Sequence, residues 1–306
     1  MQALVVHGGC EGDVISQAEK DSRLSGVYTA HDVGYAVLHS GGSALEAVEA
    51  ALKCMEDNPA FDAGRGSFYN LLGEIEMDAL LMDSTGRAGG VACIQRVQYP
   101  ISVARQVMET TDHVLLVGEG ARLFARSHGF EDFDPGTDAM QELLQRQLAD
   151  IPLSISQRIQ QYNELREPQR RYSTVGAVAV DNSGTIVAGT STGGIPLKLP
   201  GRVGDSAIIG AGTYACNLGG ASATGVGEGI IRLGITRSLF DRMAAGLSME
   251  EAARTLLSEA DAQHIPCGLT ALDRDGRFSA RHNGYFMPIR YRSAEGDDIV
   301  RAEARY

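Results

Sequence analysis

The sequence predicts an α/β protein in which mostly antiparallel sheets are covered by helices on the outside. Asp-x-x-Gly turns separate apolar runs at residues 83–86, 181–184 and 273–276. Turns this short join antiparallel strands, because a crossover between parallel strands needs roughly a dozen residues or more. The same pattern argues against a doubly wound nucleotide-binding fold, although glycines do follow the first apolar run.

Capping residues and apolar spacing predict the first elements. Residues 2–6 form an apolar run that is typical of a buried first strand. Ser43 can form a capping box with Glu46, ahead of apolar residues at helical spacing, and Ser248 repeats the pattern with Glu251. We therefore expect a helix after each serine.

Three further helices are expected along the chain. Pro100 starts a short helix that ends near Met108, since proline is favoured in a first turn. Residues 114–117 are typical of a strand, and the glycines that follow lead into a helix that stops near Gly129. A third helix is expected from about Glu228.

The residues from about 131 to 173 differ from the rest of the chain. They are highly charged and rich in glutamine, with three prolines and few large apolar side chains. Such a segment inside a compact domain is usually a linker, a lid or a disordered stretch, so we expect a mobile linker. Leu143, Leu144 and Leu148 have rough helical spacing, which indicates a surface helix in part of it.

The linker divides the chain into residues 1–173 and 174–306. Neither part is expected to be complete alone, because the predicted hairpins and helices are shared between them. We therefore predict a single domain over residues 1–306, interrupted by the linker.

Composition narrows the class of protein. The formal net charge of −12 argues against a general binder of nucleic acid or of anionic membranes, since both repel an acidic surface. The five cysteines are scattered without a CxxC pair, so reduced, buried thiols are expected. The first residues carry no basic n-region, and nowhere do some twenty apolar residues run together. The expectation is a cytoplasmic protein.

Thr174 stands where the charged linker meets an apolar run, in RRYSTVGAVAVD. Most threonines at strand starts are there only because threonine favours β-strands, and this is the plainer interpretation of Thr174. If the bond between Ser173 and Thr174 is cut, however, Thr174 carries a free α-amine beside its own hydroxyl. That amine has a reference pKa of about 8, so it can serve as the base that a threonine nucleophile needs.

The same hydroxyl can make the cut. Attack of Thr174 Oγ on the carbonyl carbon of Ser173 transfers the Ser173 acyl group from the Thr174 nitrogen to its oxygen. Water then hydrolyses the resulting ester. A planar peptide resists this reaction, so the fold must distort or polarise the bond. Autocleavage at this bond is the hypothesis that follows.

Several motifs, in this order and at close spacing, resemble those of one known family. TVGAVAVD, GTSTGG, LPGRVGDS, GAGTYA and ATGVGE, with VVHGG, DNPAFDAGRG, MDALLMD and HVLLVGEGA upstream, are similar to the plant-type L-asparaginase and isoaspartyl peptidase family of threonine-type N-terminal nucleophile (Ntn) hydrolases. The resemblance covers nearly the whole chain except the linker and the C-terminal end. It implies the Ntn-hydrolase fold, a four-layer αββα sandwich, cut into an α subunit of residues 1–173 and a β subunit of residues 174–306.

The activity that the resemblance implies is hydrolysis of β-aspartyl (isoaspartyl) dipeptides and of L-asparagine through an acyl-enzyme on Thr174. It implies no cofactor for catalysis. The implied partner is a small-molecule or dipeptide substrate, and the implied assembly is a homodimer of processed α and β subunits.

Catalytic roles carry over to residues in matching motifs. Thr192, in GTSTGG, resembles the threonine that hydrogen-bonds the nucleophile, although a capping role at a strand end is the plainer alternative. Thr224 and Gly225, in ATGVGE, resemble an oxyanion hole made of a hydroxyl and a backbone N–H, donors that stabilise a tetrahedral intermediate. For Gly225 the alternative is a tight turn before a helix.

Substrate binding is expected in GRVGDS. Arg202 and Asp205 stand three positions apart in a glycine-flanked turn, where a simple surface ion pair is the commoner outcome. The resemblance implies instead that Arg202 binds an α-carboxylate with its planar fork and that Asp205 accepts from an α-ammonium. Gly227 is implied to offer its carbonyl to the same ammonium. A substrate bound in this way is linked through its side chain, because both α groups are free.

The loop MEDNPAFDAGRG, residues 55–66, resembles one in which the family binds a structural sodium ion through backbone carbonyls. The resemblance assigns those carbonyls to Met55, Glu56, Asn58, Phe61, Ala63 and Arg65. A tight loop after a helix is the alternative, since carbonyl ligands leave almost no side-chain pattern. The histidines have no ligand spacing such as HExxH, so no catalytic metal is expected.

The sequence departs from the family pattern at several places. Ser173 stands where the family most often has glycine or aspartate, and serine tolerates strained backbone less well than glycine, which favours slower self-cleavage. Val226 stands where a small polar residue or histidine is usual, and Asp62 where asparagine is common. These changes bear on substrate preference more than on reaction type.

Two alternative functions stay open. One is a glycosylasparaginase-like hydrolase, which the lack of a secretion signal and of paired cysteines disfavours. The other is an unprocessed, non-catalytic relative that binds an amino acid, which only Ser173 favours.

Overall fold

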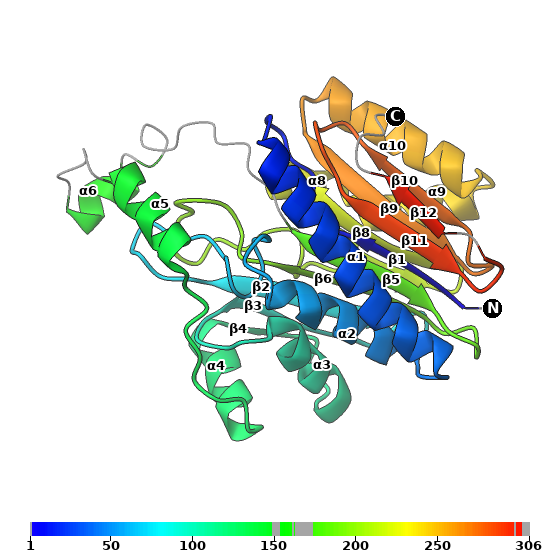
Figure 1. Ribbon diagram of the computed structural model, residues 1–306, viewed down its shortest axis with the longest axis horizontal. Coiled ribbons are helices and arrows are strands. Elements are labelled where there is room, and N and C mark those ends of the chain that lie inside the picture. Colours follow the sequence, from blue (N-terminus) through cyan, green and yellow to red (C-terminus); the bar gives the residue numbers. More distant parts are fainter. Residues whose placement is uncertain (1, 149–153, 161, 163–173, 297, 302–306) are drawn as a thin grey trace.

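The structure is a computed structural model that describes residues 2–148, 154–160, 162, 174–296 and 298–301. It is α/β, as the sequence predicts, with two sheets and helices packed on them (Figure 1). Ser173 and the linker residues 149–153, 161 and 163–173 lie outside the described residues. The expectations of a mobile linker and of a strained bond before Thr174 therefore concern mostly residues that the structure does not describe.

The larger sheet has eight strands in the order β12-β11-β1-β5-β6-β2-β3-β4. Its neighbours pair antiparallel except β3 and β4, which are parallel, so the prediction of mostly antiparallel sheets is confirmed. The strands are β1 Ala3–His7, β2 Met77–Asp83, β3 Ala88–Ile94, β4 Leu115–Val117, β5 Val175–Val180, β6 Ile186–Thr192, β11 Ile289–Ser293 and β12 Asp298–Arg301. Strands from either side of Thr174 are interleaved in this sheet, so neither part of the chain forms it alone.

The smaller sheet is antiparallel throughout its four strands, in the order β10-β9-β8-β7. Its strands are β7 Thr213–Cys216, β8 Gly219–Gly225, β9 Cys267–Asp273 and β10 Phe278–His282.

The predicted Asp-x-x-Gly turns close the hairpins β2–β3, β5–β6 and β9–β10. In each turn the aspartate Oδ1 accepts from the backbone N–H two residues later, at 2.9 Å for Asp83, Asp181 and Asp273. This local bond is the reason that aspartate favours such turns.

Helices cover the outer faces of both sheets (Figure 1). Those on the larger sheet are α1 Gln17–His39, α2 Ala44–Glu56, α3 Pro100–Thr110 and α4 Gly118–Ser127, and those on the smaller sheet are α8 Gly227–Leu233, α9 Ile235–Ala244 and α10 Met249–Ala262. The capping boxes predicted at Ser43 and Ser248 are both present. In the described parts of the chain, no helix has the length and apolarity that a membrane span requires.

Side chains of β5 divide between two cores. Ala177 and Ala179 belong to the core under α1, α2 and α3, whereas Val178 and Val180 belong to the core between the two sheets. A third core fills the space between the smaller sheet and its helices. Because β5 is buried on both faces, its sequence is a continuous apolar run rather than an alternating one.

The described part of the linker contains α5 Asp138–Leu148 and α6 Ile155–Gln160. Neither helix has a buried residue, and both extend away from the sheets in Figure 1. The surface helix predicted from three leucines is therefore confirmed as α5.

Candidate active site

Thr174 immediately precedes β5 and is 6% exposed. Its Oγ1 donates to Oγ1 of Thr192, at the end of neighbouring β6, over 3.2 Å. Oγ1 of Thr192 also accepts from the backbone N–H of Gly194 at 3.0 Å. A hydroxyl with a fixed partner at the end of a rigid strand is well oriented for attack on a bound group.

The threonines predicted for the site lie where the two sheets face each other. In β8, Ala221 and Ala223 belong to the outer core under α9 and α10, so the alternating side chains of Ser222 and Thr224 point toward the larger sheet. Contacts across the sheets agree, since Ser222 Oγ lies 2.8 Å from Thr190 Oγ1 of β6. Thr192 follows Thr190 by two positions, on the same face of β6.

His7 contacts Thr174 directly, and sequence reasoning assigned it no role. Its fully buried ring hydrogen-bonds the backbone of Thr174, and Nε2 lies 2.8 Å from Ser222 Oγ. Burial lowers the pKa of His7 to about 3, so the ring is neutral at physiological pH. The partner strand carries Gly176 opposite His7, where a Cβ would overlap both Nε2 and the Ser222 hydroxyl. The only sequence signal was this glycine inside an apolar strand.

Buried hydroxyls continue this network toward the expected substrate-binding turn. Thr213 Oγ1 donates to Thr190 Oγ1 at 2.7 Å and reaches the carbonyl of Ser206 at 3.1 Å. The chain of contacts thus runs from His7 through Ser222 to the residue after Asp205. Buried polar groups with partners rigidify the structure around them, so this network fixes the turn relative to Thr174.

Arg202, Asp205 and Gly227 lie together, as predicted. A Cβ at Gly227 would stand 2.8 Å from Arg202 Nη2 and 3.0 Å from Asp205 Oδ1. Arg202 does not act as the surface ion-pair partner of Asp205; its Nε donates to Glu228 Oε1 at 3.0 Å instead. A glycine here is needed because a side chain would fill the space between the two charged groups.

The Asp205 carboxyl is buried and incompletely bonded. It is 3% exposed, and its Oδ2 has no hydrogen-bond partner among the described residues. Burial raises the pKa of Asp205 to about 7, against the opposing effect of the nearby Arg202 charge. An unpartnered acceptor beside a guanidinium can hold an ammonium and a carboxylate of one ligand at the same time.

Asp78 connects the Arg202–Asp205 turn to the strand that carries Thr192, a role that sequence reasoning did not assign. It pairs with Thr192 across β2 and β6. Its Oδ2 accepts from the backbone N–H of Gly204 at 2.9 Å, and its Oδ1 from that of Cys93 at 2.8 Å. The Asp78 carboxyl therefore attaches the Arg202–Asp205 turn to β2, directly beside the position of Thr192 in β6.

Thr224 and Gly225 end β8 in positions that constrain them strongly. Thr224 Oγ1 accepts from the backbone N–H of Cys10 at 3.2 Å, so the segment after β1 contacts it. Gly225 has a φ of +134°, and a Cβ there would overlap the carbonyl of Pro266. Only glycine fits this backbone.

The loop predicted to bind sodium follows α2 and is closed by hydrogen bonds between its own backbone groups. The carbonyl of Glu56 accepts from the N–H of Arg65 at 2.7 Å, and that of Asn58 from the N–H of Phe61 at 3.1 Å. Gly64 and Gly66 have positive φ, and a Cβ at Gly66 would stand 2.6 Å from the carbonyl of Phe61. The described residues thus show a tight, glycine-dependent loop after a helix, in which several of these carbonyls accept hydrogen bonds from the loop itself. No cluster of three or more His, Cys, Asp or Glu suited to a metal occurs within the described residues.

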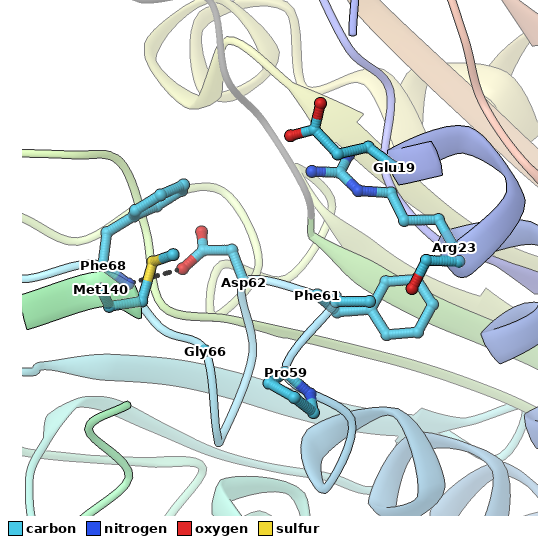
Figure 2. Close-up of a pocket in the computed structure, with 10 residues that line it drawn as sticks. Glu19, Arg23, Pro59, Phe61, Asp62, Gly66, Phe68 and Met140 are labelled. Atoms are coloured by element: carbon cyan, nitrogen blue, oxygen red, sulfur yellow. Dashed lines mark hydrogen bonds between the residues drawn. The ribbon is translucent and has the colours of Figure 1, made fainter. Parts of the chain in front are cut away.

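Asp62 in this loop contacts the residue after Thr192 and lines a cavity. Its carbonyl accepts from the N–H of Gly193, the residue after Thr192, at 2.8 Å. Its Oδ1 accepts from the N–H of Phe68 at 3.0 Å, whereas Oδ2 is buried without a described partner. The carboxyl faces a cavity of about 150 Å³ (Figure 2), lined by Glu19, Ser22, Arg23, Pro59, Ala60, Phe61, Asp62, Gly66, Phe68 and Met140.

Comparisons with known proteins agree with this arrangement. The family model described as asparaginase matches residues 1–300. A plant-type L-asparaginase of Thermococcus kodakarensis is 45% identical over 295 residues, which cover 94% of this chain and 95% of that protein. A plant-type L-asparaginase of Pyrococcus furiosus is 44% identical, with 94% and 95% covered. An isoaspartyl peptidase/L-asparaginase of Homo sapiens is 38% identical over 288 residues, covering 93% and 91%. The chain therefore belongs to the asparaginase family whose members include plant-type L-asparaginases and isoaspartyl peptidases.

Proposed function

We propose that this chain is a self-processing amidohydrolase that cleaves β-aspartyl (isoaspartyl) dipeptides and L-asparagine through an acyl-enzyme on Thr174. The observation that carries the proposal is the buried Thr174 hydroxyl, bonded to Thr192 at the start of a central strand. The relatives named plant-type L-asparaginase and isoaspartyl peptidase/L-asparaginase support it.

The reaction requires that the bond between Ser173 and Thr174 is cut. In the uncut chain the nitrogen of Thr174 is an amide, which has no basic lone pair. Cleavage by the Thr174 hydroxyl converts it to an α-amine next to the nucleophile. The products are an α subunit of residues 1–173 and a β subunit of residues 174–306, which the interleaved strands of the larger sheet keep together.

The substrate is held by its α groups. Arg202 binds the α-carboxylate, and Asp205 and the carbonyl of Gly227 accept from the α-ammonium. The unpartnered Oδ2 of Asp205 supports this assignment, because a buried acceptor costs stability until a donor reaches it. Bound in this way, the substrate presents its β-carbonyl to Thr174.

The proposed reaction then needs only groups of this chain, the substrate and water. The α-amine of Thr174 takes the proton of its hydroxyl, and Oγ1 bonds to the β-carbonyl carbon. Thr224 Oγ and the N–H of Gly225 stabilise the resulting oxyanion; the Thr224 hydroxyl, which accepts from Cys10, keeps its own O–H for donation. The carbon–nitrogen bond breaks as the ammonium returns its proton to the leaving amine. Water then hydrolyses the ester by the same route, releasing aspartate without a catalytic cofactor.

Three finer features of the family are proposed as well. The cores on either side of each sheet support the four-layer αββα sandwich of Ntn hydrolases. The resemblance of the glycine-containing loop after α2 to the family's cation-binding loop supports a structural sodium ion, held by the carbonyls of Met55, Glu56, Asn58, Phe61, Ala63 and Arg65. The working assembly is proposed to be a homodimer of processed units.

The proposal is tested by hydrolysis assays on purified protein. Wild type and Thr174→Ser should release aspartate from L-asparagine and from a β-aspartyl dipeptide, while Thr174→Ala should release none. Turnover by Thr174→Ala would remove Thr174 as the nucleophile. If wild type is inactive on both compounds but cleaves N-acetylglucosaminyl-asparagine, the glycosylasparaginase alternative replaces the proposal. Binding of aspartate by a protein that neither processes nor turns over favours the non-catalytic alternative.

A further inference from the structure

We infer that the cavity in front of Asp62 is the subsite for the second residue of a β-aspartyl dipeptide, and that it takes an apolar side chain no larger than a benzyl group. The inference rests on the proposed function and assigns a binding site to the residue that the reaction releases. Three features carry it: the position of the cavity at Asp62, the chemistry of its walls and its size.

The position follows from Asp62. Its backbone carbonyl is bonded to Gly193, which follows the Thr192 that holds the nucleophile. Its carboxyl interacts electrostatically with both Arg202 and Arg23. Asp62 therefore lies near the residue proposed to bind the α-carboxylate and also lines the cavity. A dipeptide that is held by Arg202 and attacked by Thr174 extends its leaving residue past this point.

The side wall of the cavity is apolar. Phe61 is 1% exposed and Phe68 5% exposed, and Met140 of α5 completes the wall. The Phe61 ring fits closely against α1, where a Cβ at Gly26 would stand 2.6 Å from it. Ligand pockets of this kind combine apolar walls with a few fixed polar groups. Here the polar group is Oδ2 of Asp62, which is buried, lacks a described partner and can accept from an N–H of the substrate.

The charges at the cavity disfavour an acidic leaving residue. Asp62 and Glu19 contribute carboxyl groups, and the Arg23 guanidinium is paired with the buried Glu11 carboxylate. Every leaving residue brings its own α-carboxylate, and a second carboxylate on its side chain would add to the repulsion by these groups. The cavity volume of about 150 Å³ sets the upper size, since an apolar cavity of that volume holds benzene.

Four substrates test the inference: β-aspartyl-phenylalanine, β-aspartyl-glycine, β-aspartyl-glutamate and L-asparagine. We expect wild-type kcat/KM for β-aspartyl-phenylalanine to exceed that for β-aspartyl-glycine and β-aspartyl-glutamate by about tenfold, because burying a benzyl group is favourable by one or more factors of ten. L-Asparagine leaves only ammonia and does not enter the cavity.

Ser22→Phe narrows the cavity from an exposed position on α1, so it should not harm folding. We expect it to lower kcat/KM for β-aspartyl-phenylalanine about tenfold and to change that for β-aspartyl-glycine and L-asparagine less than about twofold. The matched control is Ser25→Phe, exposed on the same helix and away from the cavity lining, which should change none of them.

Equal loss on every substrate, no loss on any, or a wild type that does not distinguish phenylalanine from glycine would overturn the subsite while hydrolysis of L-asparagine leaves the proposed function intact. A wild type that hydrolyses none of the four compounds would overturn both.

Discussion

Arg202 donates from Nε to Oε1 of Glu228 at 3.0 Å, an ion pair that directs its Nη2 group toward Gly227 and Asp205. The guanidinium thus has one edge fixed by the protein and the other available to a ligand. Planar, two-point recognition of a carboxylate depends on that second edge, and lysine cannot supply it.

Arg202→Lys should therefore weaken substrate binding more than turnover. We expect KM for L-asparagine to rise about tenfold or more, with kcat changed less than about threefold, because the lost bond acts equally in ground and transition states. Arg237→Lys, on the surface of α9 and paired with Asp241, is the control and should leave both parameters unchanged. An unaltered KM in Arg202→Lys would remove this residue from the site.

Thr192→Val should reduce kcat rather than binding. The valine has nearly the same shape but cannot accept from the Thr174 hydroxyl, so the nucleophile loses its fixed orientation. A lost hydrogen bond of this kind lowers kcat by about tenfold to a hundredfold. Thr192→Ser retains the oxygen and should restore most of the activity. Equal kinetics of the valine and serine variants would show that the contact does not orient Thr174.

Gly176→Ala should destabilise the fold. Its methyl group would overlap His7 Nε2 and Ser222 Oγ, in a buried network that has no room to move. We expect the free energy of unfolding to fall by at least about 2 kcal/mol in urea denaturation. Gly120→Ala is the comparison, because Gly120 is exposed in α4 with open space around it. That variant should be neutral or stabilised by up to about 1 kcal/mol.

The Asp205 carboxyl predicts a specific dependence of stability on pH. Its pKa in the fold is about 7, above the ordinary value near 4, so between these limits the folded protein binds more protons than the unfolded chain. The contribution of Asp205 to stability therefore declines as pH rises from about 4 to about 7 and is constant above that. Asp205→Asn removes this decline.

The comparison is best made in the Thr174→Ala background, so that processing does not differ. Asp205→Asn should gain free energy of unfolding relative to its parent between pH 4.5 and pH 8, by an amount on the order of a few kcal/mol. The same two measurements on Asp241→Asn, on the surface of α9, provide the reference for an exposed aspartate. A difference between Asp205→Asn and its parent that is independent of pH would contradict the raised pKa.

The hairpins and the capped helices that begin after Ser43 and Ser248 could be predicted from the sequence, because each depends on local chemistry. The candidate site threonines were indicated by the family resemblance instead. Helix α1 was not predicted, although Ser16 and Glu19 form the same capping box at its start. Polar or small residues, Arg23, Gly26, His31 and Gly34, interrupt the apolar residues of its buried face and weaken the helical pattern. Gly34 is required there because a Cβ would stand 2.8 Å from the carbonyl of Ala47 on α2. Close helix packing therefore replaces part of the apolar stripe on that surface.

The site was incompletely predicted for a related reason. His7 and Asp78 stand in motifs that carried the family resemblance, but what they do depends on partners across the sheets, Ser222 and the backbone of Gly204. Pairing between strands distant in sequence determines those contacts, and no local pattern records it. Glu228 was missed likewise: it was expected only as the approximate start of a helix, whereas its carboxylate holds Arg202.

The most direct test is intact-mass spectrometry of freshly purified, active enzyme together with the Thr174→Ala variant. The account predicts that active wild type consists of two polypeptides, the second beginning at Thr174, and that the variant stays one uncut chain. Wild-type protein that turns over L-asparagine while every molecule retains the bond between Ser173 and Thr174 would contradict it, because the nucleophile would then have no α-amine to activate it.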